Sequence, residues 1–438
     1  MRKANIIILF FVAILLQGNN LYAQSVVWTA LVEDADQEST CGLIRSWKAS
    51  KAVAYHKRNG NQLFSIIDSA AWTVYSAKVP TFYSIRDFRI VGDTLYCCGS
   101  SHDTAMLAYF NINEITGSPY INFRTFTIKG LSSVSHIAAF RNKIMNGVGV
   151  AAIGVETRFY EPYWFSRTHM VWCDNYNGTP FTISTKECDI SWTLTQPSES
   201  LSDVTVTESY VVYVGIYTNS NDICIRKGDK NGPFSSPLIN TIHHFSHLEP
   251  LESLPIVETL EHDTIAIASA GEDIPNELAA HIRLIDLSSM NLYNCHRIRL
   301  GVDSKVAVNE LIYMPTSKLL LMEAETDAGH QVIYLKPSAI NTYYAKTIAP
   351  ATGEMICSMD PHNRYYYILS TNKHWMLQRM GALPTSDVCI RQDSREVLIW
   401  TVSLVGSYTD DGPSLPSFFT DRKLFPTSFN TTLFCVQF

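Results

Sequence analysis

IRDFRIVGDTLYCCG, from Ile85 to Gly99, is the stretch that decides the fold. It opens with an apolar, a variable, a polar and an apolar residue, and then continues into a β-rich run. LSDVTVTESYVVYVG, from Leu201 to Gly215, matches this phrase closely. Recurrence of a phrase along a chain is the mark of a repeat architecture. We therefore expect a protein built from repeated structural units.

Weaker copies begin at Val134, Leu251, Val308 and Ile356, so that successive starts are separated by 49, 67, 50, 57 and 48 residues. A further strand-like run follows each phrase, and most are followed by another one, such as Trp72 to Val79. The runs directly after the phrases, together with the first one in the chain, are Gln62 to Asp68, Met106 to Ile112, Met170 to Asp174, Asp222 to Arg226, His281 to Leu287, Gln331 to Leu335 and His374 to Met380. Long helical periodicity is absent, and the one short helix we expect is Pro275 to His281.

Up to four short strands in roughly 50 residues are typical of one blade of a β-propeller. The seven runs predict an all-β protein with seven blades; eight is the alternative, because Val388 to Leu404 reads as another phrase. Gln24 to Glu33 has no unit of its own, and we expect it to close the ring as the outer strand of the last blade, which removes an exposed edge. The units are expected at about 41–80, 84–128, 133–187, 200–245, 251–300, 306–348 and 355–404, with 405–438 as a long loop or tail.

The phrase at Ile85 and its copies resemble β-propeller repeats, as found in uncharacterised exported propeller proteins of Gram-negative bacteria. The resemblance covers most of residues 40–405. The repeated Gly-His and Trp-Asp pairs of WD40 proteins and the Asp-box series of sialidases are both missing. The resemblance implies a fold and no function, because propellers serve as enzymes, binding platforms and scaffolds alike.

The N-terminus indicates export. Arg2 and Lys3 precede an apolar run of 11 residues from Ile6 to Leu16, and a polar stretch leads to Ala23. This order is that of a cleavable signal peptide, and the run is shorter than the roughly 20 residues of a membrane span. We expect residues 1–23 to be removed and residues 24–438 to form a single domain in the periplasm, outside the cell or on its surface. The first cysteine is Cys41, so no thiol is placed to carry a lipid anchor.

Composition excludes several partners. A net charge of −7 with scattered Lys and Arg gives no electrostatic footprint for nucleic acid. No CxxC, P-loop, HExxH or GxSxG motif is present, so we predict no cofactor and no metal. The dense run His243 to Glu249 is interpreted as a solvated connection between blades.

The cysteines are expected to be structural. Cys97 and Cys224, among other cysteines in apolar runs, are expected to be buried free thiols. The adjacent Cys97 and Cys98 are expected to point to opposite faces of one strand.

Strand order predicts where a site should lie. The third residue of each phrase starts the innermost strand of its blade, and all six such residues are polar: Asp87, His136, Asp203, Ser253, Glu310 and Ser358. We expect them around one mouth of the central channel, where they either bind a ligand or hydrogen-bond to the backbone of neighbouring blades.

The connections between the second and third strands emerge on the same face. One of them contains Phe159 to Phe165, with five aromatic residues in seven, including Tyr163 and Trp164. We interpret it either as part of a ligand platform or as a loop folded over its own blade.

These features favour a binding or interaction module for a glycan, peptide or partner protein, without assigning an enzymatic activity. One alternative is a carbohydrate-active hydrolase or lyase, which needs two carboxyl groups about 5–10 Å apart in a cleft. Another is a structural protein of the cell envelope. The ligand, the disulfide pattern and the oligomeric state do not follow from the sequence.

Export makes a direct prediction. Protein produced in a Gram-negative host should have a mature N-terminus at or near Gln24, because the leader is cleaved after Ala23. Mass spectrometry of the intact chain measures this. Recovery of a full-length chain that starts at Met1 from the cell envelope would contradict it.

Overall fold

A computed structural model of the whole chain reveals the fold. It describes residues 26–34, 43–48, 51–58, 61–68, 73–142, 147–160, 163–175, 182–187, 199–217, 222–230, 251–274, 277–299, 306–315, 318–326, 329–338, 343–349, 354–359, 365–371, 374–380, 425–426 and 432–435. These residues are almost entirely β-strand, with one short helix, α2 (Glu114–Gly117). In this part of the chain, no helix has the length and apolar character needed to cross a membrane.

The described strands form seven antiparallel sheets. The first five sheets, in chain order, are β2 (Ile44–Lys48), β3 (Lys51–Arg58), β4 (Asn61–Asp68), β5 (Thr73–Val79); β6 (Tyr83–Val91), β7 (Thr94–Ser101), β8 (Thr104–Asn111), β9 (Arg124–Ile128); β10 (Ser133–Asn142), β11 (Gly147–Tyr160), β12 (Tyr163–Asn175), β13 (Thr182–Glu187); β14 (Glu199–Val206), β15 (Tyr210–Tyr217), β16 (Ile223–Asp229); and β17 (Leu251–Thr259), β18 (Thr264–Ile274), β19 (Glu277–Asp286), β20 (Asn291–Arg299). The last two are β21 (Val306–Met314), β22 (Leu319–Thr326), β23 (Gly329–Leu335), β24 (Tyr343–Ala349); and β25 (Glu354–Met359), β26 (Tyr365–Thr371), β27 (His374–Met380), β1 (Val26–Asp34), β29 (Thr432–Cys435), β28 (Phe425–Pro426).

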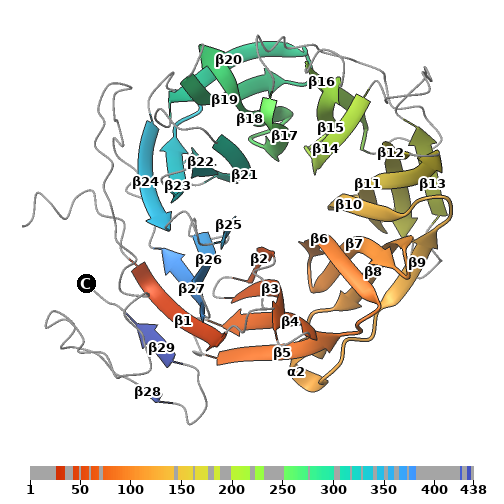
Figure 1. Cartoon of the computed structure of the whole chain (residues 1–438), viewed down its shortest axis with the longest axis vertical. Helices are drawn as coiled ribbons and strands as arrows, with labels where there is room; N and C mark the ends of the chain where they lie inside the picture. The colour runs from red at the N-terminus through yellow and green to blue at the C-terminus, as the bar shows by residue number, and fades with distance from the viewer. Residues whose placement is uncertain are drawn as a thin grey trace, which may run out of the picture.

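The sheets stand around a central opening in a propeller-like arrangement (Figure 1). The strands nearest the centre are β2, β6, β10, β14, β17, β21 and β25, and each of them contacts its counterpart in the next sheet. β25 contacts β2 as well as β21. β1 pairs antiparallel with β27, so the N-terminal strand is fourth in the sheet that also contains the last repeat.

The repeated phrase forms the two innermost strands of a sheet, as expected. Ile85 to Gly99 supplies β6 and β7, and Leu201 to Gly215 supplies β14 and β15, with the β10–β13 sheet between them. Both copies have a β-bulge at the same place. Ile85 pairs with Gly99 and Asp87 with the next residue, Cys98, which leaves Arg86 without a cross-strand partner. The same shift occurs between the first and third residues of the phrases at Val134, Leu201, Leu251 and Val308.

The bulge explains the glycine that ends the phrase. A Cβ added to Gly99 would lie 1.8 Å from the carbonyl oxygen of Ser84, and one added to Gly215 would lie 2.1 Å from that of Ser200. The extra residue therefore brings the first strand so close to the second that a side chain does not fit.

The hydrophobic core lies between neighbouring sheets. Strands such as β7 and β15 are buried on both faces, which is why they read as continuous apolar runs. Phe64 of β4 and Phe88 of β6 meet edge to face, with ring centroids 5.4 Å apart. Cys97 and Cys98 confirm the predicted alternation, because Cys97 packs in the core shared with β2–β5 and Cys98 in the core shared with β10–β13. Cys97, Cys98 and Cys224 are free and buried, and burial raises the pKa of both Cys97 and Cys98.

Two local predictions are wrong. Pro275 to His281 was expected to be helical, but β19 begins at Glu277 and pairs with β18 along its length. The aromatic segment Phe159 to Phe165 is a hairpin instead of a loop, since β11 and β12 run on until Tyr160 pairs with Tyr163. The helical pattern was too short to outweigh an apolar strand, and aromatic residues favour strands as much as platforms. His243 to Glu249 and Val388 to Leu404 lie outside the described residues.

The bulge predicts a strong effect of a small substitution. Gly99→Ala should lower the free energy of unfolding by about 2–4 kcal/mol, because the methyl group collides with backbone that the bulge holds in place. Gly117→Ala in α2 is the control, since its Cβ meets nothing within 4 Å and its effect should stay within about 0.5 kcal/mol. Equal denaturation midpoints for the two variants would contradict the close approach of the strands.

Candidate functional site

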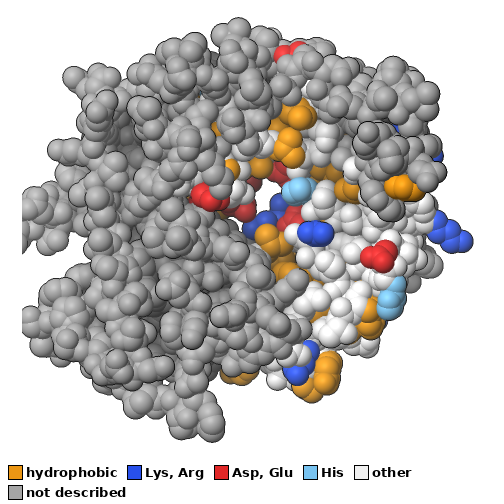
Figure 2. Space-filling view, in the orientation of Figure 1, with side chains coloured by type: hydrophobic (Ala, Val, Ile, Leu, Met, Phe, Trp, Pro, Cys, Tyr) orange, Lys and Arg blue, Asp and Glu red, His pale blue; other side chains and the backbone are white. Residues whose placement is uncertain are grey.

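A polar cavity of about 130 Å³ lies among the innermost strands, where charged and histidine side chains gather around the central opening (Figure 2). Residues from six different sheets contribute to it. Its lining residues are Leu43, Arg45, Arg86, Asp87, Arg89, His136, Asp203, Ile256, Val257, Glu258, Asn309, Glu310 and Leu311. Four of the eight predicted site residues, Asp87, His136, Asp203 and Glu310, are therefore brought together in one cavity.

Two of these four have a structural task. One carboxylate oxygen of Asp87 accepts the backbone N–H of Phe88 at 2.7 Å, and the other accepts that of Ile137, in the next sheet, at 3.1 Å. Asp203 repeats the arrangement, accepting the N–H of Val204 at 2.7 Å and that of Val257 at 2.9 Å. Each aspartate thus links its own innermost strand to the following one, and much of its hydrogen-bonding capacity serves the scaffold.

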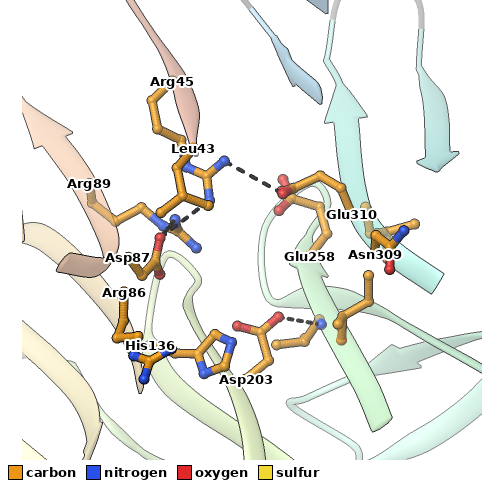
Figure 3. A pocket seen from close by; sticks show the side chains of 13 residues that line it. Leu43, Arg45, Arg86, Asp87, Arg89, His136, Asp203, Glu258, Asn309 and Glu310 are labelled. Atoms are coloured by element: carbon orange, nitrogen blue, oxygen red, sulfur yellow. Dashed lines mark hydrogen bonds and ion pairs between the residues drawn. The ribbon is translucent and has the colours of Figure 1, made fainter. Parts of the chain in front are cut away.

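Arginines surround Asp87 from two sheets. Nη1 of Arg89 lies 2.8 Å from Oδ1 of Asp87, and Nη2 of Arg45 lies 3.4 Å from the same oxygen. The other end of the Arg45 guanidinium reaches across to Glu310, with Nη1 3.5 Å from Oε2 (Figure 3). Burial alone would lower the pKa of Arg89, but nearby carboxylates, Asp87 first, raise it above the ordinary value. Arg89 is therefore held as a cation.

The opposite side of the cavity is acidic. Glu258 of β17 and Glu310 of β21 lie next to each other there (Figure 3). Burial raises the pKa of Glu258 to about 8, and the charge of Glu310 adds to this effect. Burial also raises the pKa of Glu310 and of Asp203, against the opposing influence of nearby positive groups. At neutral pH Glu258 is mostly a neutral acid, and it lies beside a second carboxyl group.

Three polar groups of the lining are not used by the scaffold. Arg86 and Asn309 are the extra residues of two bulges, both are exposed, and neither makes an ion pair or hydrogen bond with another described residue. Nδ1 of His136 is buried without a hydrogen-bond partner within the part of the chain that is described. A buried polar atom left unpaired costs free energy, so this nitrogen is suited to a ligand or a bound water molecule.

The remaining predicted residues lie elsewhere. Ser253 does not line the cavity. Its hydroxyl oxygen accepts hydrogen bonds from two backbone N–H groups, that of Ala270 at 3.1 Å and that of Val308 at 3.4 Å. Tyr163 and Trp164 are at the tip of the β11–β12 hairpin, and Ser358 is in β25, but their side chains are outside the description. Phe159, on the same hairpin, is 52% exposed.

Sequence reasoning missed Glu258 and Arg89, and a second irregularity in β17 explains the first of these. β17 has a further register shift between Ser253 and Ile256, so that counting from the start of the phrase goes wrong. Counted back from the turn between the first two strands, Glu258 pairs with Ala266 just as Arg89 pairs with Tyr96. The two turns also differ in length, with two residues between the paired Val91 and Thr94 and three between the paired Leu260 and Thr264, so an ungapped alignment of the copies misses Glu258 from either end.

Comparison with known proteins gives no functional match. No known family matches the sequence, and no curated protein does either. Among the described residues, no group of three or more His, Cys, Asp or Glu side chains is placed to hold a metal ion.

Solved structures of similar shape exist. A prolyl endopeptidase is 10% identical over 78% of this chain and 50% of its own, with a TM-score of 0.46. Prolyl oligopeptidase B from Galerina marginata is 8% identical over 77% of this chain and 48% of its own, with a TM-score of 0.45. Kluyveromyces lactis Hsv2 is 10% identical over 79% of this chain and 100% of its own, with a TM-score of 0.45. This chain thus spans about half the length of the prolyl peptidases, and at these values the matches transfer no site and no activity to it.

The pKa of Glu258 predicts a pH-dependent change in stability. The ordinary value is 4.5, and the folded value is about 8. The fold therefore loses stability as pH rises from about 4.5 to 8, where the unfolded chain ionises and the folded one does not. Glu258→Gln removes this loss, so it should raise the free energy of unfolding by about 1–3 kcal/mol at pH 9 and change it little at pH 4. Thermal denaturation at both pH values measures it, and equal effects at both would contradict the assignment.

Proposed function

We propose that this chain is an exported binding module that recognises a glycan, a peptide or a partner protein through the cavity of a seven-bladed propeller. Seven sheets of the described residues support the blade count. The pairing of β1 with β27 and the contact of β25 with β2 support closure of the ring by the N-terminal strand. The leader from Met1 to Ala23 supports export to the periplasm or beyond.

One observation carries the binding function. Some polar groups of the cavity are hydrogen-bonded within the protein, and others are available to a ligand. Asp87 and Asp203 are occupied by backbone N–H groups, whereas Arg86, Asn309 and Nδ1 of His136 are available next to apolar lining residues. Ligand sites combine apolar surface with a few convergent polar groups in this way.

Arg86 provides the test of this function. Arrays of glycans and peptides identify ligands of the mature chain, and Arg86→Ala should weaken their binding by about tenfold without lowering the melting temperature, because Arg86 is an exposed bulge residue. The control is Lys129→Ala, which removes one positive charge beyond the outermost strand β9. Ligands that bind both variants and the unaltered chain equally would contradict recognition at the cavity.

The aromatic hairpin provides a second arm of the same test. If it borders the recognised ligand, Trp164→Ala weakens binding while the melting temperature stays nearly constant. A fall in melting temperature that parallels the loss of binding would instead make Trp164 a core residue of its own sheet.

Glu258 and Glu310 favour a second candidate, a carbohydrate-active enzyme. Glycoside cleavage requires two carboxyl groups, one of them with a raised pKa, and Glu258 with Glu310 supplies such a pair. Incubation of the mature chain with a polysaccharide panel, followed by product analysis, tests it. Release of sugars that is abolished by Glu258→Gln supports catalysis, and the absence of release by the unaltered chain refutes it.

A further inference from the structure

Glu258 and Glu310 have hydrogen-bonding capacity to spare. Oε1 of Glu258 accepts the backbone N–H of Tyr313 at the long distance of 3.5 Å, and Oε2 of Glu310 lies 3.5 Å from Arg45. No other hydrogen bond or ion pair of these two carboxyl groups occurs within the described residues. Each carboxylate offers about four lone-pair sites. Two neighbouring acids with weak partners thus face the cavity, and a donor with positive charge would complete them.

Next to the two acids the cavity wall is apolar. Ile256, Val257 and Leu311 line it there, from the same strands as the two acids, whereas Leu43 lies on the arginine side (Figure 3). Leu311 belongs to the buried core between two sheets, and Ile256 packs against that core, so this wall is fixed in place. An aliphatic chain is the group that such a wall accepts.

The size of the cavity restricts the ligand further. About 130 Å³ is well below the roughly 300–1,000 Å³ of sites that enclose whole small molecules. It suits a single unbranched side chain more than a saccharide ring. A compact ammonium with three donors can lie between two carboxyl groups, whereas a planar guanidinium needs coplanar acceptors.

From these three features we propose that the cavity takes the side chain of a lysine presented by a peptide or partner protein. Its ammonium lies between Glu258 and Glu310, and its methylene groups lie against Ile256 and Leu311. Arg86 and Asn309, on the rim, donate to carbonyl groups of the backbone that carries the lysine. The inference rests on the proposed binding function and names its ligand class.

Charge neutralisation gives this proposal a distinctive readout. Glu258 faces Glu310 of β21, Arg89 of β6 and Asp203 of β14, with Arg45 of β2 behind Glu310. Glu258 is mostly protonated at neutral pH because burial and Glu310 raise its pKa. An ammonium placed beside it favours the ionised form. Binding of lysine at pH 7 therefore releases close to one proton.

The experiment uses the mature chain and an end-blocked heptapeptide with a central lysine between glycine and serine residues. Isothermal titration calorimetry in buffers of different ionisation enthalpy measures both the affinity and the proton release. Replacement of the lysine by norleucine or acetyl-lysine should weaken binding by at least about tenfold, because both lack the charge. The arginine peptide should bind more weakly than the lysine peptide.

Variants of the protein distinguish a specific role of the two acids in binding from a general effect of the protein's negative charge. Glu258→Gln should weaken binding of the lysine peptide by at least about tenfold and abolish the proton release. Asp103→Asn is the matched control. It removes one exposed negative charge in the turn between β7 and β8, where a φ of 58° suits asparagine, and should leave affinity unchanged. Melting temperatures of both variants verify that they are folded.

The outcomes distinguish the two proposals. Equal binding of the lysine and norleucine peptides, or no binding of either, overturns the lysine inference. If array ligands without lysine still depend on Arg86, the binding module stands and only its ligand class is wrong. If no ligand of any kind depends on the cavity, both proposals fail. Binding of the lysine peptide that Glu258→Gln leaves unaltered also overturns the inference, since the lysine then lies elsewhere.

Discussion

Hydrogen bonds from one innermost strand to the next hold the arrangement together at its centre. Asp87 and Asp203 each reach over a bulge to the backbone N–H of the neighbouring sheet, at 3.1 and 2.9 Å. The N–H groups satisfy carboxylate oxygens that burial removes from water. Together with other polar contacts between sheets, such as Ser202 to the carbonyl oxygen of Pro255, they add directed links to the apolar packing near the axis. The orientation of the cavity residues depends on these links.

The cavity acquires its chemistry because these links are not uniform. Where the third residue of a phrase is aspartate, its carboxylate serves the scaffold and gathers arginines around it. Where it is glutamate, as at Glu310, the longer side chain extends into the cavity and meets Glu258. On one side of the cavity a carboxylate is therefore bound by backbone N–H groups and arginines, while on the other two neighbouring carboxyl groups have only long contacts of 3.5 Å. This asymmetry is what distinguishes the site from an evenly polar channel.

Much of this follows from the sequence, because repetition carries long-range information. The phrase predicted which residues of the innermost strands face the channel, and Asp87, His136, Asp203 and Glu310 meet as a result. The prediction that they start these strands was wrong, because each strand begins several residues earlier, as β6 does at Tyr83. The sequence pattern failed where local backbone irregularity changed the count, as in β17, where Ser253 was chosen and Glu258 was missed. It also failed at Arg45, because the unit before Ile85 lacks the phrase. Pairing of side chains across the axis, such as Arg45 with Glu310, requires knowledge of the distance between sheets, which no single repeat contains.

The bulge has a consequence for how such a protein can diversify. The second residue of the phrase has no cross-strand partner, so its identity does not affect the ladder on either side. In one repeat this position holds arginine, in another asparagine and in two others serine, at Arg86, Asn309, Ser135 and Ser202. Where this side chain is exposed, as at Arg86 and Asn309, substitutions alter what the channel presents while leaving the pairing on either side intact. At Ser202 the same position is buried, and its hydroxyl donates to the carbonyl oxygen of Pro255 in the next sheet, so there it joins two sheets instead of varying freely.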